Sequence, residues 1–349
     1  MSNEQNEIAR RGLTGSLAAV SLLIIGIGVG SRNLIDYDPA LLMYTFGSLI
    51  SLFVVTFRVI IFLHRPPTRL YFVRSLELLF NRRFLPNLWL VTRAFAVNFV
   101  MQRFILRRNR LRWSAHILLS WGSILAAAVT FPLVFGWVHF ETPPTAPSTY
   151  QLFAFGFRIT EFSLATLKSW LVFNLLNISA VLVIVGTVMA LHRRLYAPGR
   201  SRARQQFGND LIPLILLLMV SVTGLMLTYS THAMGGQGYS ELSLIHALVV
   251  MVTLIYLPFG KLFHLFVRPL HLGIELYRAA DAKLPPARCR SCGEAYAGSR
   301  HVEDMKTVLG EVGLEWELEQ QEFHYAEICP ACRRRLFGIS QAHAIRRSA

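Results

Sequence analysis

Three of the segments that separate the long apolar runs contain no lysine and, between them, a single arginine. They are Ser31–Pro39, His139–Gln151 and Ser230–Glu241. Cysteine does not occur before Cys289. The sequence also lacks a phosphate-binding glycine loop, a Ser-His-Asp arrangement and paired carboxylates. These absences remove the usual sequence evidence for a soluble enzyme and point instead to an uneven distribution of positive charge.

The positive charge gathers in His64–Arg112, in His192–Arg204 and after Lys261. These basic segments alternate with the segments that lack lysine, as loops on opposite sides of a membrane do. The pattern predicts that both termini lie in the cytoplasm. The formal net charge of +15 therefore indicates membrane orientation rather than nucleic-acid binding.

Apolar residues make up 53% of the chain and are concentrated in long runs. Six runs are long enough to cross a bilayer. We expect an all-α membrane protein, a bundle of six transmembrane helices. The first helix is interpreted as retained rather than cleaved, because no small-residue cleavage pattern follows it. The spans are expected at residues 13–30, 40–63, 115–138, 162–191, 211–229 and 243–266.

The stretch Arg65–Trp113 mixes arginines with aromatic and aliphatic residues. It predicts amphipathic helices on the cytoplasmic surface, with a docking face for a soluble partner as an alternative function. A linker with two prolines separates the membrane part from a soluble tail. The expected segments are 1–63 with two helices, 64–114 on the surface, 115–272 as a haem-binding core, and 273–349 as the tail.

His246 and His264 lie 18 residues apart in one apolar run. On a continuous α-helix, 18 residues make five turns, so both imidazoles would share one face about 27 Å apart. That length is close to the hydrocarbon thickness of a bilayer, which would place one histidine near each membrane face. Histidines inside a membrane are costly, and axial ligation of haem iron is a common reason for them.

His116 and His264 lie at the cytoplasmic ends of the third and sixth runs, which predicts one bis-histidine haem b between them. His246 would serve a second haem nearer the outer face. His139 and His232 lie at outer helix ends and stay ambiguous. The remaining histidines are expected to be interfacial or solvated.

Between Asn109 and Leu272 the chain resembles the cytochrome b (gamma) subunit of respiratory nitrate reductase. Related families are the membrane cytochromes of heterodisulfide reductase and of sulfite-reductase-associated complexes. The resemblance rests on three stretches: Arg110-LRWSAHILLSWG-Ser123, Leu191-HRRLYAP-Gly199, and His246 with His264 inside LPFGKLFHLFVRPL. It implies that His116 and His264 hold the haem nearer the cytoplasm.

The family's distal haem uses a histidine ten residues after the first, where this chain has Ala126. His246 therefore lacks its expected partner, and His139 or His232 would have to replace it. The sequence leaves open whether the chain binds one haem or two.

The resemblance also matches Lys168 to a lysine that helps to bind quinol in the family. The alternative is that the Lys168 side chain only extends to the polar outer interface of the membrane. It implies a membrane-anchoring cytochrome b in a prokaryotic plasma membrane. This subunit would pass electrons between the quinone pool and a cytoplasmic iron–sulfur subunit, and any substrate chemistry would belong to other subunits. A haem-free anchor for a soluble oxidoreductase is the alternative function.

The tail contains two Cys-x-x-Cys pairs, Cys289 with Cys292 and Cys329 with Cys332, separated by 36 residues. Two such pairs favour a tetrahedral four-sulfur site. Zinc is the expected metal, in a small zinc-ribbon-like domain, and a rubredoxin-like iron is the alternative. The glycine after Cys292 is expected to permit the tight turn of its knuckle.

Overall fold

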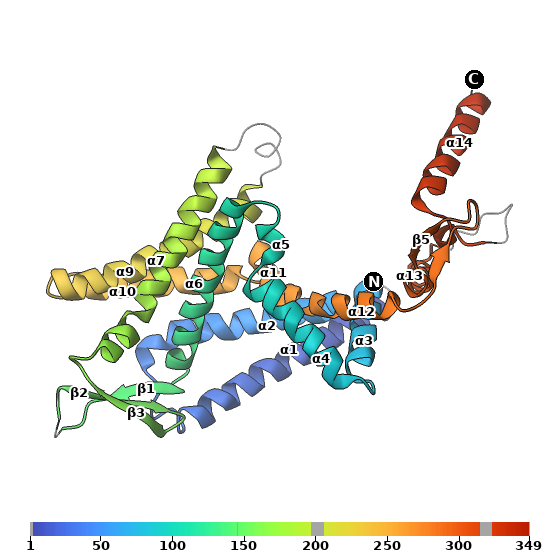
Figure 1. Cartoon of the computed structure of the whole chain (residues 1–349). Coiled ribbons are helices and arrows are strands. Elements are labelled where there is room, and N and C mark those ends of the chain that lie inside the picture. The colour runs from blue at the N-terminus through green and yellow to red at the C-terminus, as the bar shows by residue number, and fades with distance from the viewer. Residues whose placement is uncertain (1–2, 145, 197–205, 315–322, 349) are drawn as a thin grey trace. The chain divides into compact units, whose positions relative to one another are not determined.

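The computed structural model describes residues 3–144, 146–196, 206–314 and 323–348. The chain is mostly helical and divides into two compact units. The first consists of Met1–Ile60 with Val100–Val267, and the second of Ile61–Phe99 with Arg268–Ala349 (Figure 1). The expected segments at 64–114 and 273–349 thus fall largely into one unit.

Six helices of the described residues are long and apolar enough to cross a membrane, which confirms the predicted number of spans. The chain is therefore a multi-pass membrane protein. The helices are α1 (Asn3–Gly30), α2 (Leu42–His64), α6 (Arg110–Val134), α7 (Leu167–Leu195), α9 (Ile212–Ala233) and α10 (Tyr239–Tyr256). A 3₁₀ turn, η1 (Pro39–Leu41), precedes α2, and a π-helical turn, η3 (Phe207–Leu211), precedes α9.

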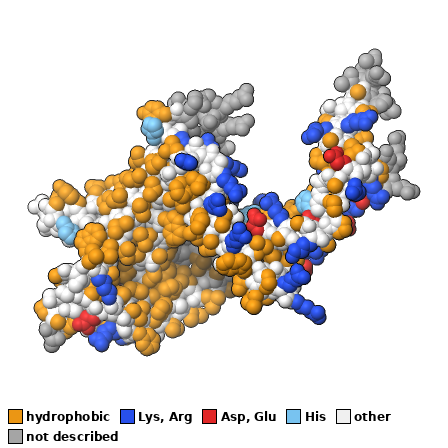
Figure 2. Space-filling view, viewed as in Figure 1, with side chains coloured by type: hydrophobic (Ala, Val, Ile, Leu, Met, Phe, Trp, Pro, Cys, Tyr) orange, Lys and Arg blue, Asp and Glu red, His pale blue; other side chains and the backbone are white. Residues whose placement is uncertain are grey.

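The spans carry their large apolar side chains on the outside. Leu22 and Val29, for example, are 70% and 75% exposed, as expected for side chains that meet lipid. Hydrophobic side chains cover the visible face of the membrane helices, and lysines and arginines are sparse there (Figure 2). Small and hydroxyl-bearing residues, such as Ser48, Ser179 and Thr187, are buried between the helices instead.

Helices α6 and α7 approach each other most closely at two glycines. A Cβ atom at Gly186 would lie 2.8 Å from the Leu119 nitrogen and 2.9 Å from the Ala115 carbonyl oxygen. A Cβ atom at Gly122 would lie 3.0 Å from the Ser179 carbonyl oxygen. The two glycines therefore let the backbones of α6 and α7 come into contact. These contacts lie before and after His116 in α6.

The third span ends at Val134, and the fourth begins only at Leu167. Gly136 turns the chain with a φ of +67°, which an L-residue rarely adopts. The following residues form an antiparallel sheet in the order β1-β2-β3, with β1 (Val138–Glu141), β2 (Thr149–Ala154) and β3 (Phe157–Ser163). The prediction of a purely helical membrane part is therefore wrong here, and His139 lies on a strand rather than on a helix.

The sixth apolar run is not one helix. Helix α10 ends at Tyr256, and the 3₁₀ turn η4 (Lys261–Phe263) and the short α11 (His264–Val267) follow. Pro258 has no N–H to continue the helix, and Gly260 leaves room for the Tyr256 ring, which a Cβ atom would overlap. The prediction that His246 and His264 share one helical face is therefore wrong.

The second unit contains the expected helices of the basic stretch and the cysteine tail. Its connections include the π-helical turn η2 (Ala96–Val100), which leads into α5 (Arg103–Leu106) of the first unit. Part of the stretch Leu191–Gly199, on which the resemblance rests, lies outside the described residues. The unit's elements are α3 (Pro66–Leu79), α4 (Phe84–Phe95), η5 (Arg268–Leu272), α12 (Gly273–Asp281), β4 (Pro286–Arg288), β5 (Ala295–Gly298), α13 (Ser299–Glu311), η6 (Tyr325–Glu327) and α14 (Pro330–Ser348).

Asp304 on α13 ties the tail to α3 and α12. Its carboxylate is buried and accepts a hydrogen bond from the Tyr277 hydroxyl at 2.6 Å and from Arg74 at 3.4 Å. Burial, reinforced by the contact with Asp304, raises the pKa of Tyr277, so its hydroxyl remains a donor at neutral pH. Tyr71 adds a contact to His301, 3.0 Å between the phenol oxygen and Nδ1.

Replacing Asp304 with Ala should destabilise the second unit by about 1–3 kcal/mol, because the buried Tyr277 hydroxyl would lose its acceptor. Thermal unfolding and limited proteolysis of the full-length protein in detergent would measure this. The neighbouring Glu303→Ala change removes an exposed carboxylate and serves as the control. Equal effects of the two changes would contradict the assignment.

Candidate functional site

The structure brings His116 and His264 together. His116 lies near the start of α6, and His264 begins α11 after the break that follows α10. Their ring centroids are 6.2 Å apart, and the ring planes meet at 62°. The two residues are 148 positions apart in sequence (264 minus 116), so the contact depends on the fold.

Both imidazoles of this pair are held through Nδ1. Nδ1 of His116 lies 2.6 Å from Oε1 of Gln102, and Nδ1 of His264 contacts the carbonyl oxygen of Lys261. A carbonyl oxygen can only accept, so Nδ1 of His264 carries the proton and Nε2 has the lone pair. In a metal-binding histidine, the hydrogen bond at one nitrogen directs the other nitrogen to the metal.

The ring separation matches the size of a shared metal site. Metal–imidazole nitrogen bonds are about 2.0–2.1 Å, and each nitrogen lies about 1.1 Å from its ring centre, so two rings ligating one ion would be separated by about 6.3 Å. The observed centroid separation of 6.2 Å leaves room for one ion between the two rings. Their donor set, two neutral imidazoles, is also that of a bis-histidine haem.

Arg58 on α2 holds the break that places His264. Its guanidinium donates to the carbonyl oxygen of Pro258 and lies 4.5 Å above the centre of the Phe263 ring. The ammonium of Lys261 contacts the carboxylate of Asp210, which is also 3.5 Å from Arg194. The residues before His264 are therefore held from α2 and from η3, the turn that precedes α9.

His246 lies near the middle of its helix rather than at the outer face. Its Nδ1 is 2.8 Å from the hydroxyl oxygen of Thr223, the twelfth of 22 residues in α9. Thr223 donates its own proton to the Met219 carbonyl at 2.7 Å, so it accepts from His246. The ring also neighbours Tyr44, with centroids 6.3 Å apart, and lies against Gly224.

Among the described residues, neither His139 nor His232 makes a hydrogen bond or ring contact with His246. His139 lies between two carboxylates, 3.2 Å from Glu141 and 3.6 Å from Asp36. Its ring stacks on Phe153 at 5.2 Å. The exposed His232 bonds the Thr228 carbonyl of its own helix. The structure thus gives His246 no histidine partner.

Asp36 makes the surroundings of His139 negative. The hydrogen bond from Arg32 is the largest influence on this carboxyl group, and it outweighs burial and holds the pKa of Asp36 below its usual range. The His139 ring therefore lies between this carboxylate and that of Glu141, at 3.6 Å and 3.2 Å, on a strand of the sheet.

Lys168 is the second residue of α7 and is exposed. Its ammonium donates to the hydroxyl of Thr160 on β3 and lies 5.3 Å from the centre of the Phe162 ring. These contacts hold the charge at the sheet, where a hydrogen-bond acceptor of a ligand could replace Thr160.

The four cysteines form one cluster in the second unit, with all four sulfurs within 4.8 Å of one another. The sulfurs of Cys292 and Cys329 are 3.8 Å apart, far beyond a disulfide bond. Zinc–sulfur bonds of about 2.3 Å in a tetrahedron place the sulfurs about 3.8 Å apart. The cluster can therefore hold one metal ion.

Two local turns aim backbone amides at the sulfurs. Gly293 has a φ of +73° after the first pair, as the sequence predicts, and the N–H of Cys329 donates to the Cys289 sulfur at 3.2 Å. Burial opposes ionisation of Cys289, but the amide donors outweigh it and lower the pKa of the thiol to about 6. Hydrogen bonds with the neighbouring cysteines raise the pKa of Cys292 to about 12 and also raise that of Cys332, so the thiolate character is concentrated at Cys289.

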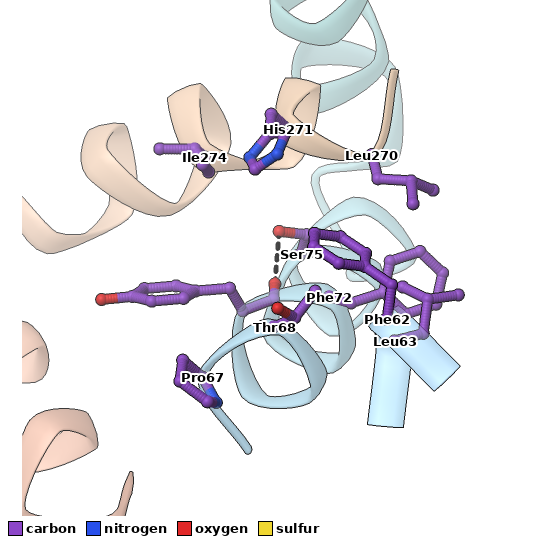
Figure 3. Close-up of a pocket in the computed structure, with 10 residues that line it drawn as sticks. Phe62, Leu63, Pro67, Thr68, Phe72, Ser75, Leu270, His271 and Ile274 are labelled. Atoms are coloured by element: carbon purple, nitrogen blue, oxygen red, sulfur yellow. Dashed lines mark hydrogen bonds between the residues drawn. The ribbon is translucent and has the colours of Figure 1, made fainter. Parts of the chain in front are cut away.

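The second unit also contains an apolar cavity of about 240 Å³ (Figure 3). Phe62 and Phe72 line it with Leu270 and Ile274, and its polar members include His271 and Ser75. The Ser75 hydroxyl donates to the Tyr71 carbonyl. The cavity suits an apolar chain, and it belongs to neither the histidine pair nor the cysteine cluster.

Sequence reasoning missed two residues that position the histidine pair. Arg58 had a signal, since it is the one charged residue in the apolar run 40–63, and such residues usually have a specific partner. Gln102 had none, because a single glutamine beside Arg103 does not stand out in a basic stretch. Comparison of the chain with protein-family models, curated proteins and solved structures gave no match.

Proposed function

We propose that this chain is the membrane cytochrome b of a respiratory redox complex, which exchanges electrons between the quinone pool and a cytoplasmic iron–sulfur partner. The observation that carries the proposal is the His116–His264 pair, with a ring separation that suits one iron and an Nδ1 contact on each ring. The resemblance to nitrate reductase cytochromes supports it further.

His116 and His264 would hold haem b through their Nε2 atoms. When bound, haem b supplies one-electron chemistry at its iron. The chain's own residues orient the ligands: Gln102 and the Lys261 carbonyl fix the two imidazoles, and Arg58 holds the break before His264.

The direction of the chain across the membrane follows from its arginines. His116 lies six residues after Arg110, and His264 four residues before Arg268, so the pair belongs to the arginine-rich side. By the distribution of basic residues this side faces the cytoplasm of a prokaryotic cell, as do both termini. A cytoplasmic iron–sulfur protein is therefore the electron partner that the site would serve.

A quinone site at Lys168 would lie far from this pair. Lys168 precedes Gly186, which touches α6 beside His116, by 18 residues, or about 27 Å of helix. His246, near mid-depth, lies between these two levels. Electron exchange between this pair and a quinone at Lys168 would therefore need a second haem at His246. Counting the haems per chain tests whether a second haem is present.

The cysteine cluster is proposed to hold zinc in a zinc-ribbon-like domain. Four thiolates bind zinc without a change of oxidation state, and the tail's buried core is small, with Cys289, Ile328 and Cys329 at its centre. Metal binding would then contribute much of the folding free energy of the tail.

Replacing either His116 or His264 with Ala should abolish the haem on the cytoplasmic side, because the two residues ligate one iron. Reduced-minus-oxidised spectra and a pyridine haemochrome count on purified membranes would measure this. His192→Ala is the control, since the His192 ring stacks on Tyr196 at the end of α7. Loss of haem in one variant alone would refute the pairing, and a haem-free wild-type protein would favour the scaffold function.

Replacing Lys168 with Ala should slow haem reduction by quinol about tenfold to a hundredfold, because a hydrogen bond from a charged donor contributes about 1.5–3 kcal/mol. Stopped-flow reduction would measure the rate, with dithionite-reduced spectra unchanged. Lys168→Arg keeps a charged donor and should retain most of the rate. A normal rate in Lys168→Ala would mean that Lys168 only reaches to the interface.

Metal analysis should give about one zinc per chain, and Cys329→Ser should lose the zinc and unfold the tail while the haem spectrum persists. Ser291→Ala, inside the first knuckle, keeps all four sulfurs and serves as the control. One non-haem iron with ferric–thiolate absorption would instead make the cluster an electron carrier.

A further inference from the structure

Gln102 occupies an unusual backbone position next to His116. It lies in a turn between η2 and α5 with a φ of +52°, which is uncommon outside glycine, and only 6% of the residue is exposed. Residues held in such conformations gather at functional sites, where surrounding contacts impose them.

Two tryptophans of α6 fasten this turn to the helix. The indole N–H of Trp113 donates to the Met101 carbonyl at 2.8 Å, and that of Trp121 donates to the Val100 carbonyl at 3.3 Å. His116 lies between the two tryptophans in sequence. The turn is thus fixed to the helix that carries the histidine, and Gln102 is aimed at its ring.

The direction of the Gln102 amide follows from Ser120. The Ser120 hydroxyl donates its single proton to the His116 carbonyl at 2.7 Å, so its oxygen accepts from Nε2 of Gln102, also at 2.7 Å. Oε1 of Gln102 then faces Nδ1 of His116 at 2.6 Å and can only accept. Nδ1 carries the proton, and Nε2 has the lone pair.

We infer that Gln102 is a positioning residue that orients His116 and sets the reduction potential of the metal that His116 holds; this rests on the proposed function. A hydrogen-bond acceptor at Nδ1 raises the basicity of the ligating nitrogen and favours the ferric state. A neutral amide does so less strongly than a carboxylate. His264 has a similar neutral acceptor, the Lys261 carbonyl, so both ligands are tuned alike.

Three variants of the full-length protein test this inference by haem content and midpoint potential. Gln102→Glu supplies a carboxylate and should keep the haem while favouring the ferric form about tenfold, a fall of about 59 mV. Gln102→Leu removes the acceptor and should raise the potential and weaken haem retention about tenfold to a hundredfold. Ser120→Ala releases the amide and should shift the potential in the direction of Gln102→Leu.

Asn177→Leu is the matched control, because it removes another amide from the membrane part, one that contacts Thr228 on α9. It should leave the potential unchanged. Shifts of the midpoint potential in opposite directions in Gln102→Glu and Gln102→Leu support the inference. Equal shifts, or none, overturn it, because a merely structural role of Gln102 would not move the potential in opposite directions. If Gln102→Leu does not accumulate, Gln102→Glu and Ser120→Ala decide. A wild-type protein without haem refutes the proposed function itself, a separate outcome.

Discussion

The hydrogen bond from Arg58 to the Pro258 carbonyl is the contact on which the histidine pair depends. Ending a helix inside an apolar segment leaves carbonyl groups without partners, and an arginine inside a membrane helix is costly as well. Each group satisfies the other, and the Phe263 ring covers the guanidinium. The chain can therefore turn after Tyr256 and bring His264 to His116, which a continuous helix would not do.

The spans could be predicted because bilayer thickness fixes the length of an apolar run, and they were found in the expected number. The proximity of His116 to His264 could also be predicted, because the neighbouring arginines place both at one depth. The separation of this pair from His246 could not be predicted from the sequence. Pro258 lies within an apolar sequence, and composition does not tell whether a proline bends a helix or ends it.

The contacts that orient the ligands arise between segments far apart in sequence. Gln102 reaches His116 only because the turn before α5 is held in a left-handed conformation by two indoles of α6. Nothing in the local sequence of Gln102 requires that conformation. The strands after Val134 were missed for a related reason, since the apolar run continues to Trp137 and only the φ of Gly136 redirects the chain.

The two units use one principle in different surroundings. In the first unit, which contains the six apolar spans, the polar groups of Arg58, Gln102 and Thr223 each have a partner within the protein. In the second unit, the buried Asp304 accepts a hydrogen bond from Tyr277, and the four thiols lie close enough together to share one metal ion. Asp304 contacts Arg74 of α3 and Tyr277 of α12, so the tail that carries the cysteine cluster is joined to helices from two other parts of the chain.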